Sequence, residues 1–368
     1  MTSCRANFSV LLLDDHGHHS LAVATCLAQI PGIELHVLSN IRWPAVRLSR
    51  FVTSFYTCPD TNNEAAQLDE IRRVSRAVRA DVLLPASESG ARLLTRDRAA
   101  FNGQTHLPPL PPPELYETVV NKNSLAHCLD QHGIRSAPTF LFTSIAAAER
   151  DLKHLPFPVL LKPIFGGTGL GICRFDKPTP LLEALRSRPL ASESYILQSY
   201  VPGRDVDCSV LCRDGRILAH TLQMSARPRR NPFAADDALA FVSHTAAFAA
   251  VEKAMAALRW SGVAHLDMRE DERDGQFHIV DFSARFWMTL LGSLAVGVNF
   301  PHLACLAALK IEFPPPTFEP ANYFTAQAAL KELASGRLRG YKSGLPYALN
   351  DPGPRALNLI KRFARRVW

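Results

Sequence analysis

The 368-residue sequence lacks the features that mark several specialised classes of protein. It has no continuous apolar run of the ~18–20 residues that a membrane-spanning helix requires. Its first residues, MTSCRANFSVLLLDD, go directly into a strand-like run that ends in acids. Its eight cysteines are scattered without a CxxC pair, so all of them, Cys208 and Cys212 included, are expected to be reduced core residues. These absences favour a cytoplasmic enzyme with no transmembrane segment.

Two common nucleotide-binding motifs are absent as well. No GxGxxG follows the first predicted strand, which excludes a standard dinucleotide site. No GK[ST] leads into a helix, which excludes a Walker-type phosphate loop. Any nucleotide must therefore be bound by a different arrangement of residues.

The basic and acidic residues balance outside the carboxyl-terminal end. Residues 331–368 hold nine Lys or Arg and two acids, a surplus of seven that accounts for the whole net charge of +7. We therefore expect no nucleic-acid partner. The run ALNLIKRFARRVW has the pattern of an amphipathic basic helix. Such a helix would either dock on the protein's own surface or make weak contact with an anionic membrane surface.

The first part of the chain alternates buried strand-like runs with amphipathic helices, from Asn7 to about Leu110. This alternation predicts a small parallel, Rossmann-like sheet. The loop DDHGHHS follows the first strand, and Glu88 follows a later one, at the edge where open α/β sheets bind ligands. His16, His18 and His19 would contact a ligand or metal there, or else form a solvated loop.

A proline-rich run, LPPLPPPELY at residues 107–116, predicts a domain boundary. Lys122 begins the next helix, and a later strand carries Lys162. That strand leads into a loop with glycines at 166, 167, 169 and 171. Consecutive amides without Cβ interference suit a polyphosphate, and glycines that join two strands indicate a flexible flap over it.

Two further segments carry polar groups suited to a nucleotide and its substrate. In LQSYVPGRD, Gln198 and the backbone near Val201 suit an adenine edge, and Asp205 suits ribose hydroxyls. The same segment also fits an ordinary strand. Arg227, Arg229 and Arg230 lie in a later loop that would either hold an anionic substrate or face solvent.

The segment 262–301 reads as a β-hairpin with a polar face. Because side chains alternate along a strand, Asp267 is expected opposite Asp281, with Ser283 and Arg285 on the same face. Phe282, Ala284 and Phe286 form the opposite, apolar face. Hard oxygen ligands suit Mg²⁺, and a guanidinium suits a developing oxyanion or acyl phosphate.

The ordered series NKN, LLKP, GGTGLG, LQSYVPGRD and HLDMRED…IVDFSARFW resembles the ATP-grasp superfamily, especially its carboxylate–amine ligases. The resemblance implies that ATP is bound together with Mg²⁺, for which Mn²⁺ is an alternative. The residues that it implies for the ATP phosphates are Lys122, Lys162, Gly166, Gly167, Thr168 and Gly169. Those that it implies for adenosine are Gln198, Val201 and Asp205. It assigns the metal to Asp267, Asp281 and Ser283, and catalysis to Lys162 and Arg285.

The sequence departs from this superfamily at three of these positions. Such enzymes usually have Glu at the positions of Gln198 and Asp281, and Asn at the position of Ser283. The amide oxygen of Gln198 can still accept from an adenine amino group. The other two changes bear on metal affinity, since Asp is one methylene shorter than Glu and a hydroxyl is a poorer Mg²⁺ ligand than an amide oxygen.

The resemblance predicts an α/β protein with the ATP-grasp fold. We expect an N-terminal pre-ATP-grasp domain with a parallel sheet at residues 1–112 and an ATP-grasp domain at 113–330, followed by a basic tail at 331–368. The ATP-grasp domain would contain a small α+β lid at about 138–203 with the glycine-rich loop, and a C-terminal α+β part with an antiparallel sheet.

The predicted activity is ATP-dependent ligation of a carboxylate to an amine through an acyl phosphate, with release of ADP and phosphate. Two alternatives remain open. One is a regulatory or scaffold protein that binds nucleotide with weakened turnover, and the other is an enzyme of the same fold that phosphorylates or carboxylates without forming an amide. The sequence identifies neither the acid nor the amine, and it leaves the oligomeric state open, a homodimer included.

Overall fold

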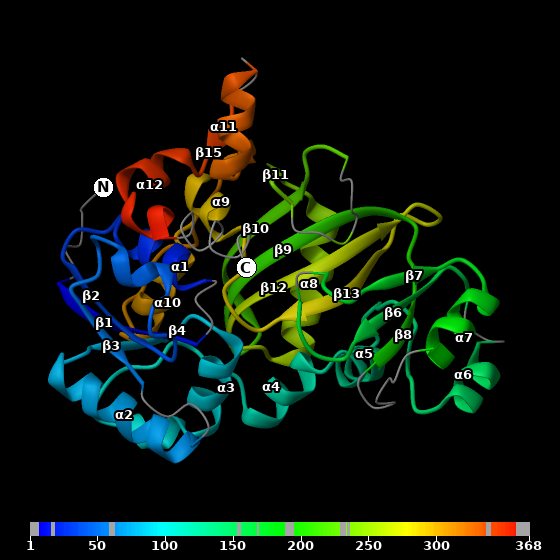
Figure 1. The fold of residues 1–368 in the computed structure, drawn as a ribbon, viewed down its shortest axis with the longest axis horizontal. Helices are drawn as coiled ribbons and strands as arrows, with labels where there is room; N and C mark the ends of the chain where they lie inside the picture. Colours follow the sequence, from blue (N-terminus) through cyan, green and yellow to red (C-terminus); the bar gives the residue numbers. More distant parts are fainter. Residues whose placement is uncertain are drawn as a thin grey trace.

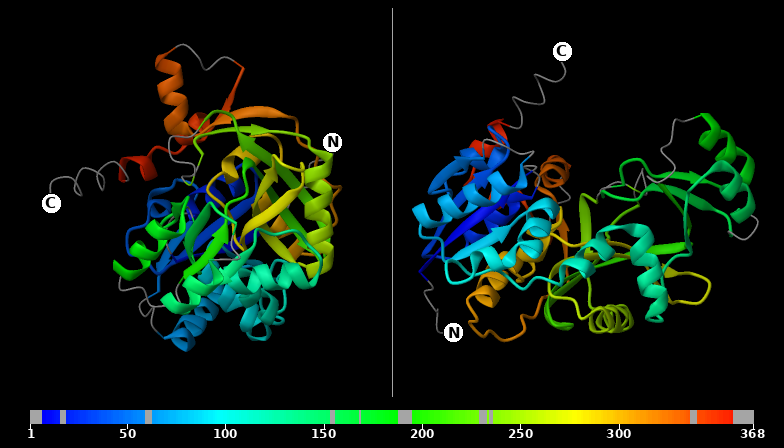
Figure 2. Two further views of the ribbon diagram at one scale, coloured as in Figure 1. Left: turned by 90° about the vertical axis from the view of Figure 1, so that its right-hand side faces the viewer. Right: turned by 90° about the horizontal axis from the view of Figure 1, so that it is seen from below.

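The computed structural model describes residues 7–15, 19–58, 63–152, 156–167, 169–187, 195–228, 233, 236–335 and 340–357. Three sheets organise these residues, and Figure 1 shows the N-terminal sheet on the left, the central sheet in the middle and the sheet of the lid on the right. An N-terminal α/β domain and a small lid lie at opposite ends of the molecule, with a large central sheet between them (Figures 1 and 2). Among the described residues, no helix is long and apolar enough to cross a membrane.

The N-terminal domain has a parallel sheet with strand order β3-β2-β1-β4. Its strands are β1 (Phe8–Asp14), β2 (Ile33–Ser39), β3 (Ser54–Thr57) and β4 (Val82–Pro85). Its helices are α1 (Ser20–Leu27), α2 (Glu64–Ala77) and α3 (Glu88–Arg96), with 3₁₀ turns at Ala45–Leu48 and Arg98–Phe101. The predicted parallel sheet is confirmed. Strand β3 was not predicted, because a four-residue edge strand gives too short a pattern to recognise.

Both faces of this sheet are covered, which explains why its strands read as continuous apolar runs. Alternate residues of β1 pack on α1 on one face, and the others pack on α2 and α3. Helix α10 (Phe300–Ala308), from far along the chain, covers the first face together with α1. The N-terminal domain therefore shares its core with the central part of the molecule.

The lid consists of an antiparallel sheet of order β5-β8-β6-β7 with two helices on one face. Its strands are β5 (Thr139–Leu141), β6 (Val159–Pro163), β7 (Cys173–Phe175) and β8 (Tyr195–Ser199). Its helices are α6 (Ile145–Asp151) and α7 (Pro178–Ser187). Helices α4 (Pro113–Val120) and α5 (Lys122–Gln131) connect the N-terminal domain to the lid.

The central sheet has strand order β13-β12-β9-β10-β11-β14-β15 and is antiparallel except at its last pair. Its strands are β9 (Gly203–Arg213), β10 (Arg216–Ser225), β11 (Ala238–Phe241), β12 (Gly262–Asp271), β13 (Phe277–Ser283), β14 (Ala321–Phe324) and β15 (Lys342–Ser343). Its remaining helices are α8 (Thr245–Leu258), α9 (Leu290–Ala295), α11 (Ala326–Ala334) and α12 (Leu345–Asn350). Helix α8 packs on the apolar face, where Cys208 and Cys212 are buried in the core as expected.

The end of the described chain is tied to the rest of the molecule. Helix α11 runs across residue 330, which is the predicted end of the ATP-grasp domain. Strand β15, beyond that residue, pairs with β14. Asp351 is buried and accepts hydrogen bonds from the hydroxyl of Ser49 (2.5 Å) and the backbone N–H of Arg50 (3.2 Å) in the N-terminal domain. Most of the predicted basic helix, residues 358–368, lies outside the described residues.

Candidate active site

The hairpin of β12 and β13 has the predicted register, with Asp267 directly opposite Asp281. A β-bulge leaves Val280 without a partner, because Met268 pairs with Ile279 while Asp267 pairs with Asp281. The extra residue shifts the alternation, so Phe277 and Ile279 pack in the core while Asp281 and Ser283 face the other side.

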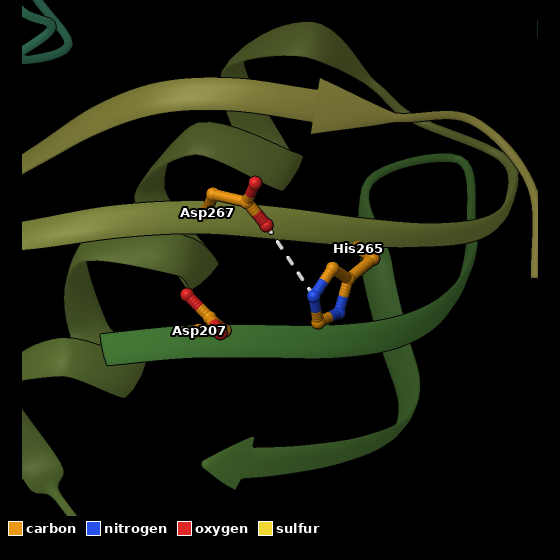
Figure 3. A group of neighbouring side chains, drawn as sticks. All are labelled: Asp207, His265 and Asp267. Atoms are coloured by element: carbon orange, nitrogen blue, oxygen red, sulfur yellow. Dashed lines mark ion pairs between the residues drawn. The ribbon is translucent and has the colours of Figure 1, made fainter. Parts of the chain in front are cut away.

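Polar residues continue across the neighbouring strands in register. Asp267 pairs on its other side with Asp207 of β9, which in turn pairs with Gln223 of β10. Asp281, Asp267, Asp207 and Gln223 therefore form a row across four strands. Figure 3 shows Asp207 and Asp267 pointing into the same space from adjacent strands. The amide of Gln223 donates to Asp207 (3.4 Å) and accepts from the hydroxyl of Thr289 (3.0 Å).

His265 lies beside this row, two residues before Asp267 on β12. Its Nε2 is 3.3 Å from Oδ1 of Asp267, its Nδ1 is 2.9 Å from the hydroxyl of Ser209, and its ring stacks on Trp287. Burial, aided by the charge of Arg285, lowers the pKa of His265 to about 3, so its imidazole is neutral near pH 7. The contacts with Ser209 and Trp287 hold this neutral ring against the carboxyl group of Asp267.

The pKa values of Asp267 and Asp207 are raised above the ordinary value of an aspartate. Burial, reinforced by the nearby charge of Asp281, raises the pKa of Asp267, and burial followed by the charge of Asp267 raises that of Asp207. Like charges this close disfavour joint ionisation, and a cation between them would relieve the repulsion. The oxygens of Asp267, Asp281 and Ser283 are the hard ligands that Mg²⁺ prefers, so these residues fit such an ion.

Two buried lysines face the carboxylate row from other elements. Lys122, at the first position of α5, lies with Nζ 3.4 Å from Asp281 and donates to the carbonyl of Gly166 (2.6 Å). Lys162, on β6, donates to Oε1 of Gln198 (2.6 Å). Burial lowers the pKa of Lys162 to about 8, although the charge of Asp281 opposes the shift. A buried ammonium of this kind suits a multiply charged anion.

The glycine-rich loop between β6 and β7 lies close to Phe233 and to Arg285. A Cβ added at Gly167 would lie 3.0 Å from Nη2 of Arg285, and one added at Gly169 would lie 1.7 Å from the carbonyl oxygen of Phe233. Gly166 and Gly169 also have positive φ, of 96° and 71°. These contacts explain why glycine is needed here. The flap motion itself stays a prediction, and Thr168 lies outside the described residues.

Arg269 organises the segment that connects β8 to β9. Its guanidinium donates to the carboxylate of Asp205 and to the backbone carbonyls of Val201 and Gly203, and it lies over the ring of Tyr200 at 4.7 Å. Arg174 of the lid lies over the same ring at 4.5 Å. Arg269 thus fixes the strand edge where Gln198, Val201 and Asp205 were predicted to meet adenosine.

One cleft between the lid and the central sheet brings these predicted residues together. Those that line it are Lys162, Gly167, Gly169, Gln198, Val201, Asp205, Asp267, Asp281, Ser283 and Arg285. Lys122 and Gly166 adjoin it through their contacts with Asp281 and with each other. The arrangement places anionic, cationic and neutral polar groups within reach of one polyphosphate-sized ligand.

Other polar residues noted in the sequence lie elsewhere or are not described. Arg227 forms ion pairs with Asp237 and Glu332 (2.8 Å to the latter), so its charge is engaged within the protein. Arg229, Arg230, His16 and His18 lie outside the described residues. Glu88 is the first residue of α3, where its backbone carbonyl accepts from the hydroxyl of Tyr116 (2.7 Å).

Sequence reasoning missed Asp207, His265 and Arg269. The signal was present as two alternating polar series, Asp205–Asp207–Ser209 and His265–Asp267–Arg269. The pairing aligns them residue by residue, with Asp205 opposite Arg269, Asp207 opposite Asp267 and Ser209 opposite His265. Each series alone is compatible with a solvated strand face.

No protein-family model matches the chain. The three-part arrangement of N-terminal domain, lid and central sheet is shared with solved structures. One is an L-amino acid ligase from Bacillus licheniformis (TM-score 0.65, 20% identity, covering 86% of this chain and 78% of that one). Another is N5-carboxyaminoimidazole synthetase from Staphylococcus aureus in complex with ADP (TM-score 0.71, 14% identity, covering 91% and 88%). The chain has the ATP-grasp fold that its sequence predicts.

In sequence, part of the chain is similar to a D-alanine–D-alanine ligase from Azobacteroides pseudotrichonymphae. The two are 26% identical over 91 residues, which cover 24% of this chain and 28% of that ligase. The matched stretches span little more than a quarter of the length of the first curated relatives. The resemblance to the ATP-grasp carboxylate–amine ligases is thus confirmed at the level of the superfamily.

Proposed function

We propose that the protein is an ATP-dependent ligase that joins a carboxylate to an amine. The observation that carries this proposal is the row of Asp281, Asp267 and Asp207 facing Lys122 and Lys162 across one cleft. Carboxylates and ammonium groups that converge in this way suit a metal-bound polyphosphate better than any neutral ligand. The partial sequence likeness to a D-alanine–D-alanine ligase supports the same class of reaction.

In this proposal the triphosphate lies between the two lysines and the glycine-rich loop. The ammonium groups of Lys122 and Lys162 offset the charge of the transferring phosphoryl group, and the amides of the loop donate to its oxygens. Asp267, Asp281 and Ser283 would hold Mg²⁺, which supplies Lewis-acid polarisation of the phosphates; Mn²⁺ has the same ligand preferences. His265 lies against the carboxyl group of Asp267.

The base and ribose would lie against the segment from β8 to β9. Gln198 and the backbone of Val201 would meet the base, and Asp205, which also pairs with Arg269, would accept from ribose hydroxyls. The lowered mobility of Asp205 that follows from this ion pair reduces the entropy cost of binding.

The reaction then proceeds in two steps. A substrate carboxylate oxygen attacks the γ-phosphorus of ATP and the bond to ADP breaks, which gives an acyl phosphate. The amine nitrogen next attacks the acyl carbon, phosphate leaves, and the amine loses a proton. Arg285, beside the loop and the carboxylate row, would stabilise negative charge on the acyl phosphate. The protein's tasks are positioning and electrostatic stabilisation.

A coupled assay tests the proposal. The protein is incubated with ATP, Mg²⁺ and pooled amino acids and small carboxylic acids, and ADP release is measured while mass spectrometry searches for a product that has lost one water. The proposal expects ADP release that requires both an acid and an amine. An Arg285→Ala variant should keep ATP affinity and lose most of this turnover, since its proposed partner is the intermediate.

A second candidate is a nucleotide-binding regulatory protein with little turnover. Ser283 and Asp281 favour it, because a hydroxyl and a shorter carboxylate are weaker metal ligands than the Asn and Glu that similar enzymes have. ATP binding without ADP release in the presence of any acid and amine would support this candidate. ADP release that needs an acid but no amine would instead indicate phosphorylation, and dependence on bicarbonate would indicate carboxylation.

A further inference from the structure

A directed series of hydrogen bonds runs from the cleft along one face of the lid sheet to its edge strand β5. The ammonium of Lys162 donates to Oε1 of Gln198 (2.6 Å), and Nε2 of Gln198 donates to the hydroxyl oxygen of Thr139 (3.0 Å). The hydroxyl of Thr139 then donates to the backbone carbonyl of Ala137 (2.8 Å). Gln198 is buried, and Thr139 lies directly beside it because the two residues pair between β5 and β8.

The partners at both ends of this series of hydrogen bonds, Lys162 and Thr139, fix which way the Gln198 amide points. Lys162 can only donate, so the atom facing it must be the amide oxygen. The single proton of Thr139 is used by Ala137, so Thr139 can only accept from Gln198, and the atom facing it must be the amide nitrogen. A carboxylate at position 198 would have two equivalent oxygens and need no such orientation, whereas a carboxamide does.

We propose that Thr139 is a positioning residue that holds the Gln198 amide with its oxygen toward the nucleotide. The site then selects a base that carries an exocyclic amino group over one with a carbonyl oxygen at the same position. The inference rests on the proposed function, because it places a purine base against β8. Gln198 lines the cleft, whereas Thr139, on the edge strand β5, is not among the residues that line it and belongs to a separate groove with Asn123 and His127.

The selectivity follows from what the buried amide oxygen can do. It has a second lone pair, which an amino group of the base satisfies by donating. A carbonyl oxygen in that position would face another oxygen and leave both without a donor, and a buried unpaired polar group is costly. Sites built around a specific hydrogen bond therefore reject an analogue that lacks the matching group.

Binding of ATP and of inosine triphosphate tests the proposal, because inosine has a carbonyl oxygen where adenosine has the amino group. Dissociation constants are measured by calorimetry with the full chain and Mg²⁺ for the unmodified protein and for Thr139→Val and Thr139→Ser. We expect the unmodified protein to bind ATP tighter by roughly tenfold or more. Thr139→Val should reduce that ratio about threefold or more, since the amide nitrogen loses its acceptor, and Thr139→Ser should restore it.

Gln198→Glu provides a second test in case Thr139→Val does not fold. Gln198→Glu removes the amide nitrogen but keeps two acceptor oxygens, so it should still prefer ATP. Equal affinity of the unmodified protein for the two nucleotides would overturn the inference and leave the ligase proposal standing. An unchanged ratio in folded Thr139→Val, or a loss of preference in Gln198→Glu, would overturn it too. If the unmodified protein binds neither nucleotide, the proposed function itself fails.

Discussion

Asp281 is the residue whose charge the candidate site depends on most directly, because it faces both Asp267 and the ammonium of Lys122. Asp281→Asn keeps the size of the side chain and removes the negative charge. We expect turnover to fall by orders of magnitude, on the scale of ~3–4 kcal/mol for a lost preorganised electrostatic contact. Cooperative unfolding in urea should be retained. Full ligase turnover of Asp281→Asn at limiting Mg²⁺ would show that the metal assignment is wrong.

Ser283 allows a substitution that should strengthen the metal site, whereas Asp281→Asn should weaken it. It follows Asp281 on the same face of β13 and contributes a neutral hydroxyl to the cleft. Ser283→Asn supplies an amide oxygen, so the Mg²⁺ concentration for half-maximal activity should decrease, and Ser283→Ala should increase it. A titration of activity against Mg²⁺ for the three proteins checks this. Identical titrations for all three would remove Ser283 from the metal site.

Lys162 makes nucleotide binding depend on pH. Its folded-state pKa of about 8 lies below the ordinary value of 10.5, so the ammonium is present below pH 8 and is lost as pH rises through that value. ATP phosphates favour the charged form, so ATP affinity should fall by at most about tenfold per pH unit above pH 8.

The same shift affects stability with its own sign. The unfolded chain binds more protons than the folded one between pH 8 and 10.5, so this group's contribution to stability increases with pH over that window.

Calorimetric titration with ATP from pH 7 to 9.5 checks the prediction that ATP affinity falls above pH 8. Gln198→Glu places a carboxylate beside the ammonium, raises the pKa of Lys162, and should move the loss of affinity to higher pH. A flat profile in both proteins would contradict the role of Lys162.

At the scale of elements, the glycine-rich loop between β6 and β7 is the segment where backbone shape matters most. A Cβ at Gly169 would lie 1.7 Å from a backbone oxygen, a distance that forces the loop or its neighbour to move. We expect Gly169→Ala to weaken binding of an ATP analogue markedly, because the loop amides leave their positions.

Gly103 provides a matched control for that substitution. It has a similar φ of 73°, yet a Cβ there would meet nothing within 4 Å. Gly103→Ala should cost stability by about 1 kcal/mol through backbone strain alone and leave nucleotide affinity unchanged. Equal nucleotide affinities for Gly169→Ala and the unmodified protein would show that the loop does not contribute to binding.

At the scale of the whole molecule, the carboxyl-terminal residues divide at about Leu357. The contacts of Asp351 with Ser49 and Arg50 lie before that point and attach the described chain to the N-terminal domain. A chain that ends at Leu357 should therefore keep its thermal stability and nucleotide binding. It should also lose any sedimentation with anionic vesicles, which the basic residues of the removed segment would cause. Equal sedimentation of the full chain with anionic and neutral vesicles would contradict the membrane-surface interpretation.

The sequence by itself determined the parallel N-terminal sheet, the hairpin of β12 and β13, and the set of motifs that resemble the ATP-grasp superfamily. These features rest on the alternation of side chains along single strands and helices, which is a local property of the chain. The expectation that Asp267 lies opposite Asp281 also came from the sequence, although the register that fulfils it includes the bulge at Val280.

Only the tertiary structure decided which other polar residues lie beside Asp267 and Asp281. Asp207 lies 60 positions from Asp267 in the chain, and only the register between β9 and β12 sets the two side by side. The bulge at Val280 decides that Asp281 faces the cleft while Ile279 faces the core. Likewise, the proton on Thr139 is committed only because Ala137 lies within reach, and this fixes the amide of Gln198. Register, bulges and hydrogen-bond direction depend on contacts between distant segments, which a pattern along one strand does not contain.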